Sequence, residues 1–240
     1  MQELLARASK VLVFTGAGIS TGSGIPDFRG PQGVWKRRQP VLIQEFLADH
    51  EKRVEYWDYK LEGYEGFCLA QPNAAHLALV ELDRRGKLLA VVTQNIDGLH
   101  VLAGLPEDKV LELHGTNRLV ACLGCDHREQ PERSFREFEA SRQPPKCPAC
   151  GGWLKPATIS FGQALDQALL GRAFSLAEEA DLVLSLGSTL SVEPAASVPR
   201  LAAQRGVPYV VVNRGATDHD HLATHRVEAD LVEWLPQFLG

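Results

Sequence analysis

The stretch Val11-Leu-Val-Phe-Thr-Gly16-Ala17-Gly18-Ile19-Ser20 joins a continuous apolar run to a turn rich in glycine. A run that is apolar at every position is typical of a strand buried on both faces, as in the parallel sheet of an α/β fold. Glycines directly after such a strand permit a tight turn and a close approach of the backbone to a pyrophosphate, with the N-terminus of a following helix as N–H donor. The dehydrogenase form of this motif is not met, because Thr21 stands where glycine or alanine is expected. A glycine turn that binds no ligand is the alternative.

Further short apolar runs alternate with helical patterns along the chain, which favours parallel α/β winding. The other expected strands are 88–93, 110–113, 181–186 and 207–212. Apolar residues at three-and-four spacing predict helices over 73–85, 165–180 and 195–205. The sequence therefore predicts an open parallel sheet with helices on both faces.

Two segments interrupt this alternation: 30–71 is rich in aromatic and charged residues, and 117–153 contains four of the five cysteines. We interpret both as insertions that build a small module from a helical part and a zinc ribbon. The expected division assigns 1–30, 72–116 and 154–240 to a discontinuous sheet domain, and 31–71 and 117–153 to the small module. Open α/β sheets bind ligands beyond the carboxyl ends of their strands, and pockets favour domain junctions, so the cleft between the two parts is the expected ligand site.

The cysteine spacing gives the strongest chemical signal in the chain. Cys122-x2-Cys125 is followed after 21 residues by Cys147-x2-Cys150, which suits tetrahedral zinc held by four thiolates. Since all four positions are thiolates, no ligand position is open to water, and the zinc is expected to stabilise the module rather than to catalyse. A redox dithiol at Cys147 and Cys150 is the alternative. Cys68 is left over, and we expect it to be a small, partly buried apolar residue.

Polar side chains that could contact a ligand follow several of the expected strands. Gln94, Asn95 and Asp97 follow one of them, and amide and carboxylate groups there could orient a ribose and a carboxamide. His114 ends the next strand and is a candidate general base, because the ordinary pKa of histidine, about 6.5, lies near working pH. The remaining candidates are the loop Asp27-Phe28-Arg29 and the turns Gly187-Ser188-Thr189 and Asn213-Arg214-Gly215. The alternatives are an Asx-turn after the first of these strands and a purely structural role for the histidine.

Composition and charge disfavour several classes of function. The chain has 25 Lys and Arg against 30 Asp and Glu, a net charge of −5, and 45% apolar residues. An obligate binder of duplex DNA or of anionic membranes usually carries a basic face, which this balance disfavours. The first ten residues lack the pattern of an export signal, and no apolar run approaches the roughly 20 residues of a membrane helix. We therefore expect a cytoplasmic protein without membrane or direct nucleic-acid contacts, in whose reducing surroundings paired cysteines hold metal.

Taken together, these motifs resemble those of the sirtuins, the NAD-dependent protein lysine deacylases, over about residues 8–238. The shared motifs are, in order, Gly16-Ala-Gly-Ile-Ser20, Ser23-Gly-Ile-Pro-Asp-Phe-Arg29, Thr93-Gln-Asn-Ile-Asp97, His114-Gly115, the two cysteine pairs and Gly187-Ser-Thr189. The chain has the compactness of a prokaryotic member. The resemblance implies a Rossmann-like sheet domain with an inserted zinc module, NAD as co-substrate and one structural Zn²⁺. It implies nicotinamide, free lysine and O-acyl-ADP-ribose as products.

By this resemblance His114 takes a proton from a ribose hydroxyl, and Asn95 is a second catalytic residue. The residues implied to contact NAD are Gly16, Ala17, Gly18, Ser20, Asp27, Phe28, Arg29, Gln94, Asn95, Ile96, Asp97, His114, Gly187, Ser188, Thr189, Asn213, Arg214, Gly215 and Ala229. The implied zinc ligands are Cys122, Cys125, Cys147 and Cys150. An acyl-lysine peptide or protein is the implied partner, entering as an added strand near Phe161-Gly162, and a monomer is favoured.

Three departures from the family pattern bear on the substrate. Trp57-Asp58-Tyr59-Lys60 stands where members that remove succinyl or malonyl groups carry a Tyr-x-x-Arg pair, so a preference for acidic acyl groups is not expected. Gln163 stands where glutamate commonly follows Phe-Gly, and Gly187-Ser-Thr189 reverses the commoner order of the two hydroxyl residues. Deacetylation is the expected function. Protein mono-ADP-ribosylation from the same NAD site and a non-catalytic NAD sensor are the alternatives.

Overall fold

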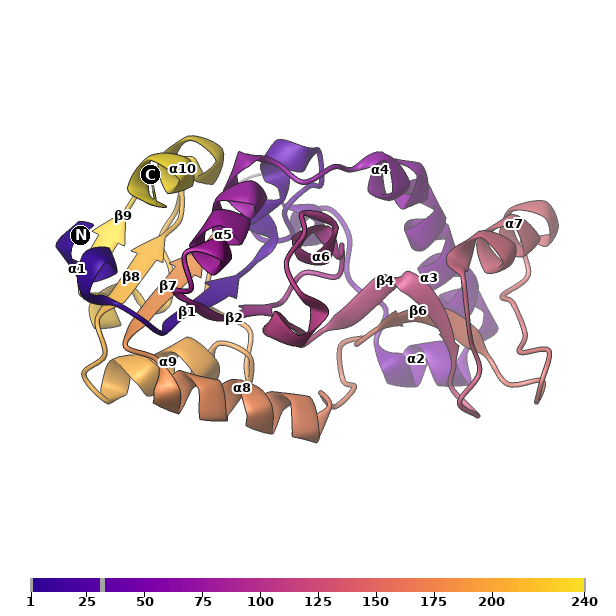
Figure 1. The fold of residues 1–240 in the computed structure, drawn as a ribbon. Helices are drawn as coiled ribbons and strands as arrows, with labels where there is room; N and C mark the ends of the chain where they lie inside the picture. The colour runs from indigo at the N-terminus through magenta and orange to yellow at the C-terminus, as the bar shows by residue number, and fades with distance from the viewer. Residues whose placement is uncertain (1, 31–32, 240) are drawn as a thin grey trace.

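The computed structural model describes residues 2–30 and 33–239, and a parallel sheet of six strands runs through its larger part (Figure 1). The strands lie in the order β3-β2-β1-β7-β8-β9, and every neighbouring pair is parallel. Their bounds are β1 Val11–Thr15, β2 Leu88–Thr93, β3 Val110–Glu112, β7 Leu182–Leu186, β8 Tyr209–Val212 and β9 His225–Val227. The predicted open parallel sheet is confirmed, and β9 is an additional edge strand.

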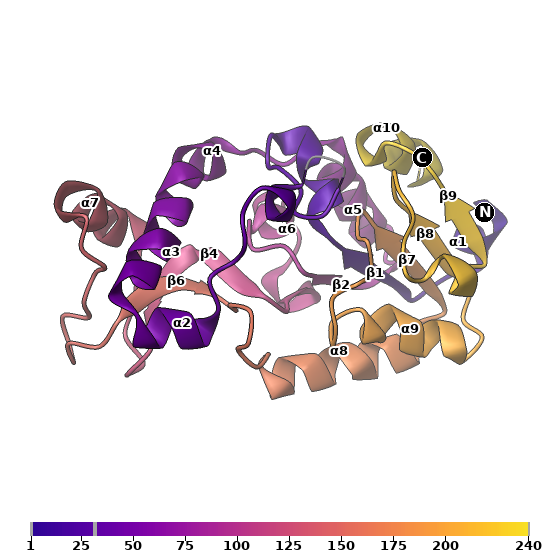
Figure 2. The ribbon, with the colours of Figure 1, turned by 180° about the vertical axis from the view of Figure 1, so that it is seen from behind.

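Helices cover both faces of this sheet, because alternate residues of the central strands point to opposite sides. Val11 and Val13 of β1 are buried in one core cluster, and Leu12 and Phe14 are buried in the other. The first cluster lies under α1 (Gln2–Arg7), α5 (Ala74–Arg84) and α10 (Leu231–Leu239), and the second under α8 (Gln167–Glu179) and α9 (Ser197–Gln204). Figures 1 and 2 show α5 and α10 on one side of the sheet and α8 and α9 on the other. Burial of β1 on both sides is the physical reason why Val11 to Phe14 are all apolar.

The sheet changes its direction of winding at β1. This strand pairs with β2 on one side and with β7 on the other, so the chain moves outward in opposite directions from the centre. At such a point the loops that follow neighbouring strands separate and leave a crevice at the carboxyl edge. The loops after β1, β2 and β7 border this crevice and carry most of the candidate ligand residues.

The segment 16–24 after β1 contains no α-helix, in contrast to the general form of the glycine motif. It forms two single turns of 3-10 helix, η1 (Ala17–Ile19) and η2 (Thr21–Ser23), and Gly24 ends the second with a left-handed φ of 83°. Glycines interrupt this segment too often for a stable α-helix, since each costs about 1 kcal/mol relative to alanine. Other short elements are η3 (Val34–Lys36), α6 (Leu99–Leu102), η4 (Glu107–Lys109) and η5 (Asp220–Leu222).

The small module lies at the end of the molecule away from β9 (Figures 1 and 2). It consists of α2 (Ile43–Ala48), α3 (His50–Glu62), α4 (Tyr64–Leu69) and α7 (Pro131–Ser141) around an antiparallel sheet in the order β5-β4-β6. The strands are β4 Gly115–Cys122, β5 Arg128–Glu129 and β6 Leu154–Thr158, so the module's sheet extends beyond the expected range 117–153 at both ends. Aromatic rings dominate its core: the Trp57 ring lies 5.3 Å from Phe135 and 5.8 Å from Phe138, centroid to centroid. Positions 31 and 32 of the expected module range lie outside the described residues.

One expectation for the module is wrong. Cys68 is exposed rather than partly buried, because α4 is a short surface helix in which no residue is buried. None of the helices within residues 2–30 and 33–239 is long and apolar enough to cross a membrane.

Candidate active site

One open cavity of about 1920 Å³ lies between the carboxyl edge of the parallel sheet and the small module. It is lined by almost all of the residues that the sequence singled out for cofactor contact, and these come from several separate segments of the chain. Those lining it are Gly16, Ala17, Gly18, Asp27, Phe28, Arg29, Gln94, Asn95, Ile96, Asp97, His114, Gly187, Ser188, Thr189, Asn213, Arg214, Gly215 and Ala229. Ser20 is the exception: it is fully buried behind the lining, and its hydroxyl donates a hydrogen bond to Asp97.

The glycine turn after β1 packs directly against the glycine turn after β7. The Gly18 N–H donates to the Gly187 carbonyl at 2.8 Å, and the Gly16 N–H donates to Leu186 at 3.1 Å. A Cβ on Gly16 would lie 2.8 Å from the Gly187 oxygen, and one on Gly18 would lie 2.7 Å from the Gly187 Cα. Gly187 itself has a left-handed φ of 66°. The approach of the two turns, rather than ligand contact alone, therefore explains why these three positions are glycine.

A buried hydrogen-bond network holds the polar residues that follow β2. Asn95 is 7% exposed, and its amide donates to the Gly16 carbonyl at 3.1 Å and to Ser20 Oγ at 3.2 Å. The Ser20 hydroxyl donates in turn to the Asp97 carboxylate at 2.7 Å, and the other Asp97 oxygen accepts from the Leu99 N–H at 2.9 Å. This network connects the glycine turn to the polar residues that follow β2. The Asx-turn alternative at Asp97 is thus also realised, alongside the contacts to Ser20.

His114 stands where the sheet domain meets the small module, between β3 and β4. Its Nδ1 lies 3.0 Å from the Gln94 carbonyl oxygen, which can only accept, so the neutral ring carries its proton on Nδ1 and leaves a lone pair on Nε2. Burial lowers its pKa below the ordinary value, the Gln94 bond opposes this, and the nearby Arg29 cation lowers the pKa further. A ring that is neutral at pH 7, with one nitrogen free to accept a proton, fits a general base.

Aromatic side chains from three separate segments of the chain line the cavity near Arg29. Phe28 stacks on Trp35 with centroids 5.3 Å apart, and Phe161 meets the edge of Trp35 at 6.0 Å. The Arg29 guanidinium lies 5.9 Å from the Phe161 ring centroid, and burial lowers its pKa. Sequence reasoning assigned no role to Trp35. The high aromatic content of 30–71 was the available signal.

Helix α3 contributes several residues to the cavity. The sequence analysis named only its stretch 57–60. Trp57 points into the module core and is fully buried, whereas Tyr56, Tyr59 and Lys60 line the cavity. The Lys60 ammonium donates to Asn117 Oδ1 at 3.1 Å, and burial lowers its pKa to about 8. The Tyr56 hydroxyl is 3.3 Å from Thr158 Oγ1. The helix therefore presents two tyrosines and one lysine to the cavity, and Glu55 and Glu62 also lie in its lining.

The turns after β7 and β8 close the opposite end of the cavity. Ser188 Oγ accepts from the Gln94 amide at 2.8 Å and from the Leu190 N–H at 3.1 Å. The Asn213 amide donates to the carbonyl of Gly215 at 2.9 Å, so it shapes its own turn, and Arg214 pairs with Asp230. Hydroxyl, amide and backbone groups thus border this end, as a nucleoside would require.

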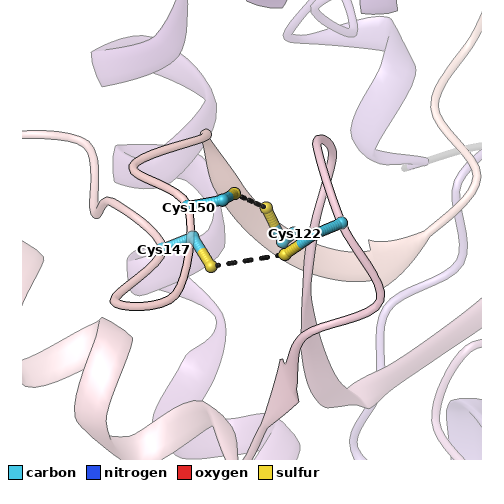
Figure 3. A group of neighbouring side chains, drawn as sticks. Cys122, Cys147 and Cys150 are labelled. Atoms are coloured by element: carbon cyan, nitrogen blue, oxygen red, sulfur yellow. Dashed lines mark hydrogen bonds between the residues drawn. The ribbon is translucent and has the colours of Figure 1, made fainter.

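The four predicted zinc ligands come together at one end of the small module. The Sγ atoms of Cys122, Cys125, Cys147 and Cys150 all lie within 4.8 Å of one another. Figure 3 shows Cys122 and Cys150 facing each other, and their sulfurs are 3.5 Å apart. Zn–S bonds of about 2.3 Å in a tetrahedron place sulfurs about 3.8 Å apart, so the spacing fits one Zn²⁺. The Gly124 N–H donates to Cys122 Sγ at 3.2 Å and the Gly152 N–H to Cys150 Sγ at 3.4 Å, which stabilises thiolates at both knuckles.

Comparison with known proteins adds independent findings to this geometry. The Sir2 family model matches residues 16–194. The chain is 41% identical to an NAD-dependent protein deacetylase of Rhodopseudomonas palustris, covering 99% of this chain and 94% of that protein. It is 41% identical to NAD-dependent protein deacetylase 2 of Streptomyces coelicolor, covering 95% and 96%.

Solved structures of Sir2 proteins superpose closely on the whole chain. One, named as a complex with a p53 peptide and NAD⁺, gives a TM-score of 0.89 at 37% identity, covering 98% of this chain and 94% of that one. Another, bound to a propionylated peptide, gives 0.88 at 36% identity with the same coverage. A third holds a deacetylated peptide with 3'-O-acetyl ADP-ribose and gives 0.91 at 37% identity, again covering 98% and 94%.

Proposed function

This chain belongs to the Sir2 family, and from that premise we propose that it is an NAD-dependent protein lysine deacylase, a deacetylase first of all. The products are nicotinamide, free lysine and O-acyl-ADP-ribose. The observation that carries the proposal is the convergence of the glycine turns, the strand-end amides and His114 on one cavity. Relatives at about 40% identity are named NAD-dependent protein deacetylases, and Sir2 structures with acylated or deacetylated peptides share the fold.

We assign the two ends of the cavity to the two halves of NAD. The adenosine half lies at the turns Gly187-Ser188-Thr189 and Asn213-Arg214-Gly215, with Ala229 beside them. The nicotinamide half lies near Asn95, Ile96, Asp97 and the loop Asp27-Phe28-Arg29, while Ser20 orients Asp97 from behind. When bound, NAD supplies the ADP-ribosyl acceptor for the acyl group and nicotinamide as leaving group.

His114 is the general base in this assignment. Its Nδ1–H is held by the Gln94 carbonyl, so Nε2 takes a proton from a ribose hydroxyl without a change of tautomer. The Asn95 amide donates to the glycine turn and to Ser20 at the same time, and so holds the turn in place relative to the base. Positioned proton transfer of this kind is worth about 10²–10⁴-fold in rate.

The acyl-lysine reaches the base from the side of Phe161, which is 38% exposed beside β6. An extended peptide there adds a strand between the small module and the sheet domain. Tyr56, Tyr59 and Lys60 line the same cavity, and they are the α3 residues available to contact the acyl group. We place the enzyme in the cytoplasm as a monomer, with 1–30, 72–116 and 154–240 as the NAD-binding domain and 31–71 and 117–153 as the small module.

The zinc has a supporting role. All four sulfurs belong to the protein, so a bound Zn²⁺ has no open position for water and stabilises the fold around β4 and β6. His114 precedes β4 directly, and its carbonyl accepts from the Ile159 N–H at 2.8 Å, just after β6. The zinc module therefore supports one side of the base without touching it.

Mass spectrometry of turnover on acetyl-, longer-acyl- and succinyl-lysine peptides tests the proposal. Nicotinamide, deacylated peptide and acyl-ADP-ribose should form in step, and His114→Ala should lower the rate by about 10²–10⁴-fold while NAD binding persists. His221→Ala, at an exposed histidine on η5, is the matched control and should match the unaltered protein. Nicotinamide release with ADP-ribose left on protein would replace deacylation by mono-ADP-ribosylation. NAD binding without any turnover would make the chain a sensor.

A further inference from the structure

Two fully buried histidines lie side by side behind the lining of the cavity. His76 of α5 is 0% exposed and His100 of α6 is 1% exposed, and their ring centroids are 5.0 Å apart at an interplanar angle of 57°. Each ring has one nitrogen in use. The other nitrogens, His76 Nε2 and His100 Nδ1, have no hydrogen-bond partner among the described residues. Buried polar atoms without partners are uncommon in folded proteins, so this pair calls for an explanation.

The partners of His76 determine which of its nitrogens carries the proton. The Asn73 backbone N–H donates to His76 Nδ1 at 3.3 Å, so Nδ1 presents a lone pair. A neutral imidazole has one protonated nitrogen and one acceptor. The proton of neutral His76 therefore sits on Nε2, and the unpartnered atom of this ring is a donor.

The partners of His100 give the complementary answer. The Thr15 hydroxyl donates its single proton to Thr93 Oγ1 at 2.7 Å, so it can only accept from His100 Nε2, 2.9 Å away. His100 thus carries its proton on Nε2 and keeps a lone pair on Nδ1. The unpartnered atom of this ring is an acceptor.

Both rings are neutral at ordinary pH, as this assignment requires. Burial lowers the pKa of His76 to about 4, partly opposed by the Asp97 carboxylate, and burial together with the neighbouring His76 lowers the pKa of His100 to about 3. Two rings in contact therefore hold one spare donor and one spare acceptor between them.

We propose that His76 Nε2–H donates to His100 Nδ1, directly or through one buried water, and that the two histidines are positioning residues for the deacylation proposed above. The link completes a chain from Asn73 through His76, His100, Thr15 and Thr93 to the backbone N–H of Asn95, which donates to Thr93 Oγ1 at 3.0 Å.

Both ends of this hydrogen-bond chain contact the loop 16–23, which borders the proposed cofactor site. At one end the Asn73 amide donates to the Ile19 carbonyl at 2.8 Å and to Ser23 Oγ at 2.9 Å. At the other end Asn95 donates to Gly16 and Ser20. The chain therefore fixes Asn95 relative to the loop 16–23 from behind, and its loss should affect the chemical step more than peptide binding. A shift of a reacting group by about 1 Å can cost about 10²-fold in rate.

Nitrogen NMR of the histidine rings, in protein without ligand, tests the proposed hydrogen-bond chain independently of activity. The resonances are assigned with His76→Leu and His100→Gln. We expect both rings to be neutral from pH 8 to pH 5.5, with the proton on Nε2 in each. A proton on Nδ1 of His100, or protonation of either ring above pH 6, overturns the proposal. This measurement still decides whether the hydrogen-bond chain exists if the protein shows no deacylase turnover. The absence of turnover would refute only the proposed function.

A double-mutant cycle tests the positioning role. His76→Leu and His100→Gln each break the link between the rings, and the glutamine keeps a donor toward Thr15. Each should lower kcat about tenfold with the KM for peptide unchanged, and the double variant should fall about tenfold rather than about 100-fold, since residues of one network are not additive. Leu82→Ala, a core change on the same helix away from the chain, should lower the melting temperature with kcat nearly unchanged. Multiplicative losses, or kcat losses that simply follow thermal stability as measured by Leu82→Ala, overturn the positioning role.

Discussion

The sheet domain and the small module are stabilised by different means. In the sheet domain every residue of β1 and β7 is buried, and two aliphatic clusters fill the space between the sheet and its helices. In the module most residues of β4 are only half-buried, β5 has two residues, and the core is a small aromatic cluster beside the four cysteines. We therefore expect the first part to fold on its buried apolar surface alone and the second to depend on a bound metal.

This difference matters for activity because the site needs both parts. His114 is anchored to the sheet domain through its ring, by Gln94, and to the module region through its carbonyl, by Ile159. The cofactor turns belong to the sheet domain alone. Loss of the module should therefore remove catalysis while part of the nucleotide cradle persists.

The largest expected effect is that of zinc loss. Cys147→Ser should release the metal, because Cys147 is a buried ligand whose N–H and carbonyl also close the second knuckle. Structural zinc contributes about 10–16 kcal/mol of apparent folding free energy in zinc-finger peptides, so β4 to β6 should lose amide protection while β1, β2 and β7 keep theirs. Hydrogen exchange with a parallel zinc assay measures this. A zinc-free variant with full protection in the module would contradict the proposed division of stability.

Two core substitutions test whether the sheet domain and the small module unfold separately. Phe138→Ala in the module should cost about 3–5 kcal/mol and Leu184→Ala in β7 about 2–5 kcal/mol. After chelation of zinc the cost of Leu184→Ala should remain, but that of Phe138→Ala should vanish because the module is already unfolded. Urea unfolding followed through single-tryptophan variants distinguishes them, since Trp57 reports the module and Trp234 reports α10. Equal behaviour of the two variants after chelation would show one cooperative unit instead of two.

The same contrast explains what the sequence could predict of the fold. Runs such as Tyr209–Val212 are apolar because both faces of the strand are covered, so their strand state is visible locally. The edge strand His225–Val227 has three half-buried residues and no such run. Strand β4 carries Thr116, Asn117 and Arg118 in sequence, without alternation, and its pairing with β6 is irregular between Gly115 and Val120. Patterns tied to burial were predictable, and strands defined only by pairing were not.

The candidate site follows the same rule. Residues after parallel strands share one edge of the sheet, so Asn95, His114 and Ser188 could be grouped from their positions alone. Lys60 and Tyr56 reach the cavity through the packing of α3 against β6, about 100 positions apart in sequence, which no local pattern encodes. The function of Ser20, which holds Asp97 from behind rather than lining the cavity, likewise depends on long-range contact.

The pH dependence of catalysis offers a smaller effect at the junction of the two parts. Burial lowers the pKa of His114, so the base stays neutral below its ordinary value of about 6.5, and kcat/KM should fall only as pH drops through the lowered pKa. Chelation of zinc should uncover the ring and return its pKa toward the ordinary value. NMR titration of His114 in the metal-loaded and chelated proteins measures both. An unshifted pKa in the loaded protein, or no change on chelation, would show that the module does not desolvate the base.

The smallest effect concerns the sheet domain alone. The exposed Asp181 carboxylate accepts from the Ser9 and Lys10 N–H groups at 2.8 and 2.9 Å and from Ser9 Oγ at 2.8 Å. Burial would raise its pKa, but these hydrogen bonds outweigh burial and lower it. A lowered pKa in the folded state stabilises the protein above the unfolded value of about 3.9, and this contribution is lost as pH falls through the folded value.

Asp181→Asn should therefore cost about 1 kcal/mol at pH 7, a figure reduced for solvent screening at an exposed site. The cost should shrink toward zero when both states of the unaltered protein are protonated, near pH 2 if the fold persists there. Urea unfolding of the two proteins at pH 7 and at the lowest pH that keeps the sheet folded measures the difference. Because these hydrogen bonds of Asp181, the residue before β7, all go to the connection between α1 and β1, the same difference should appear with zinc bound and with zinc removed. A cost that depended on zinc would mean that the stability of the sheet domain is coupled to the module after all.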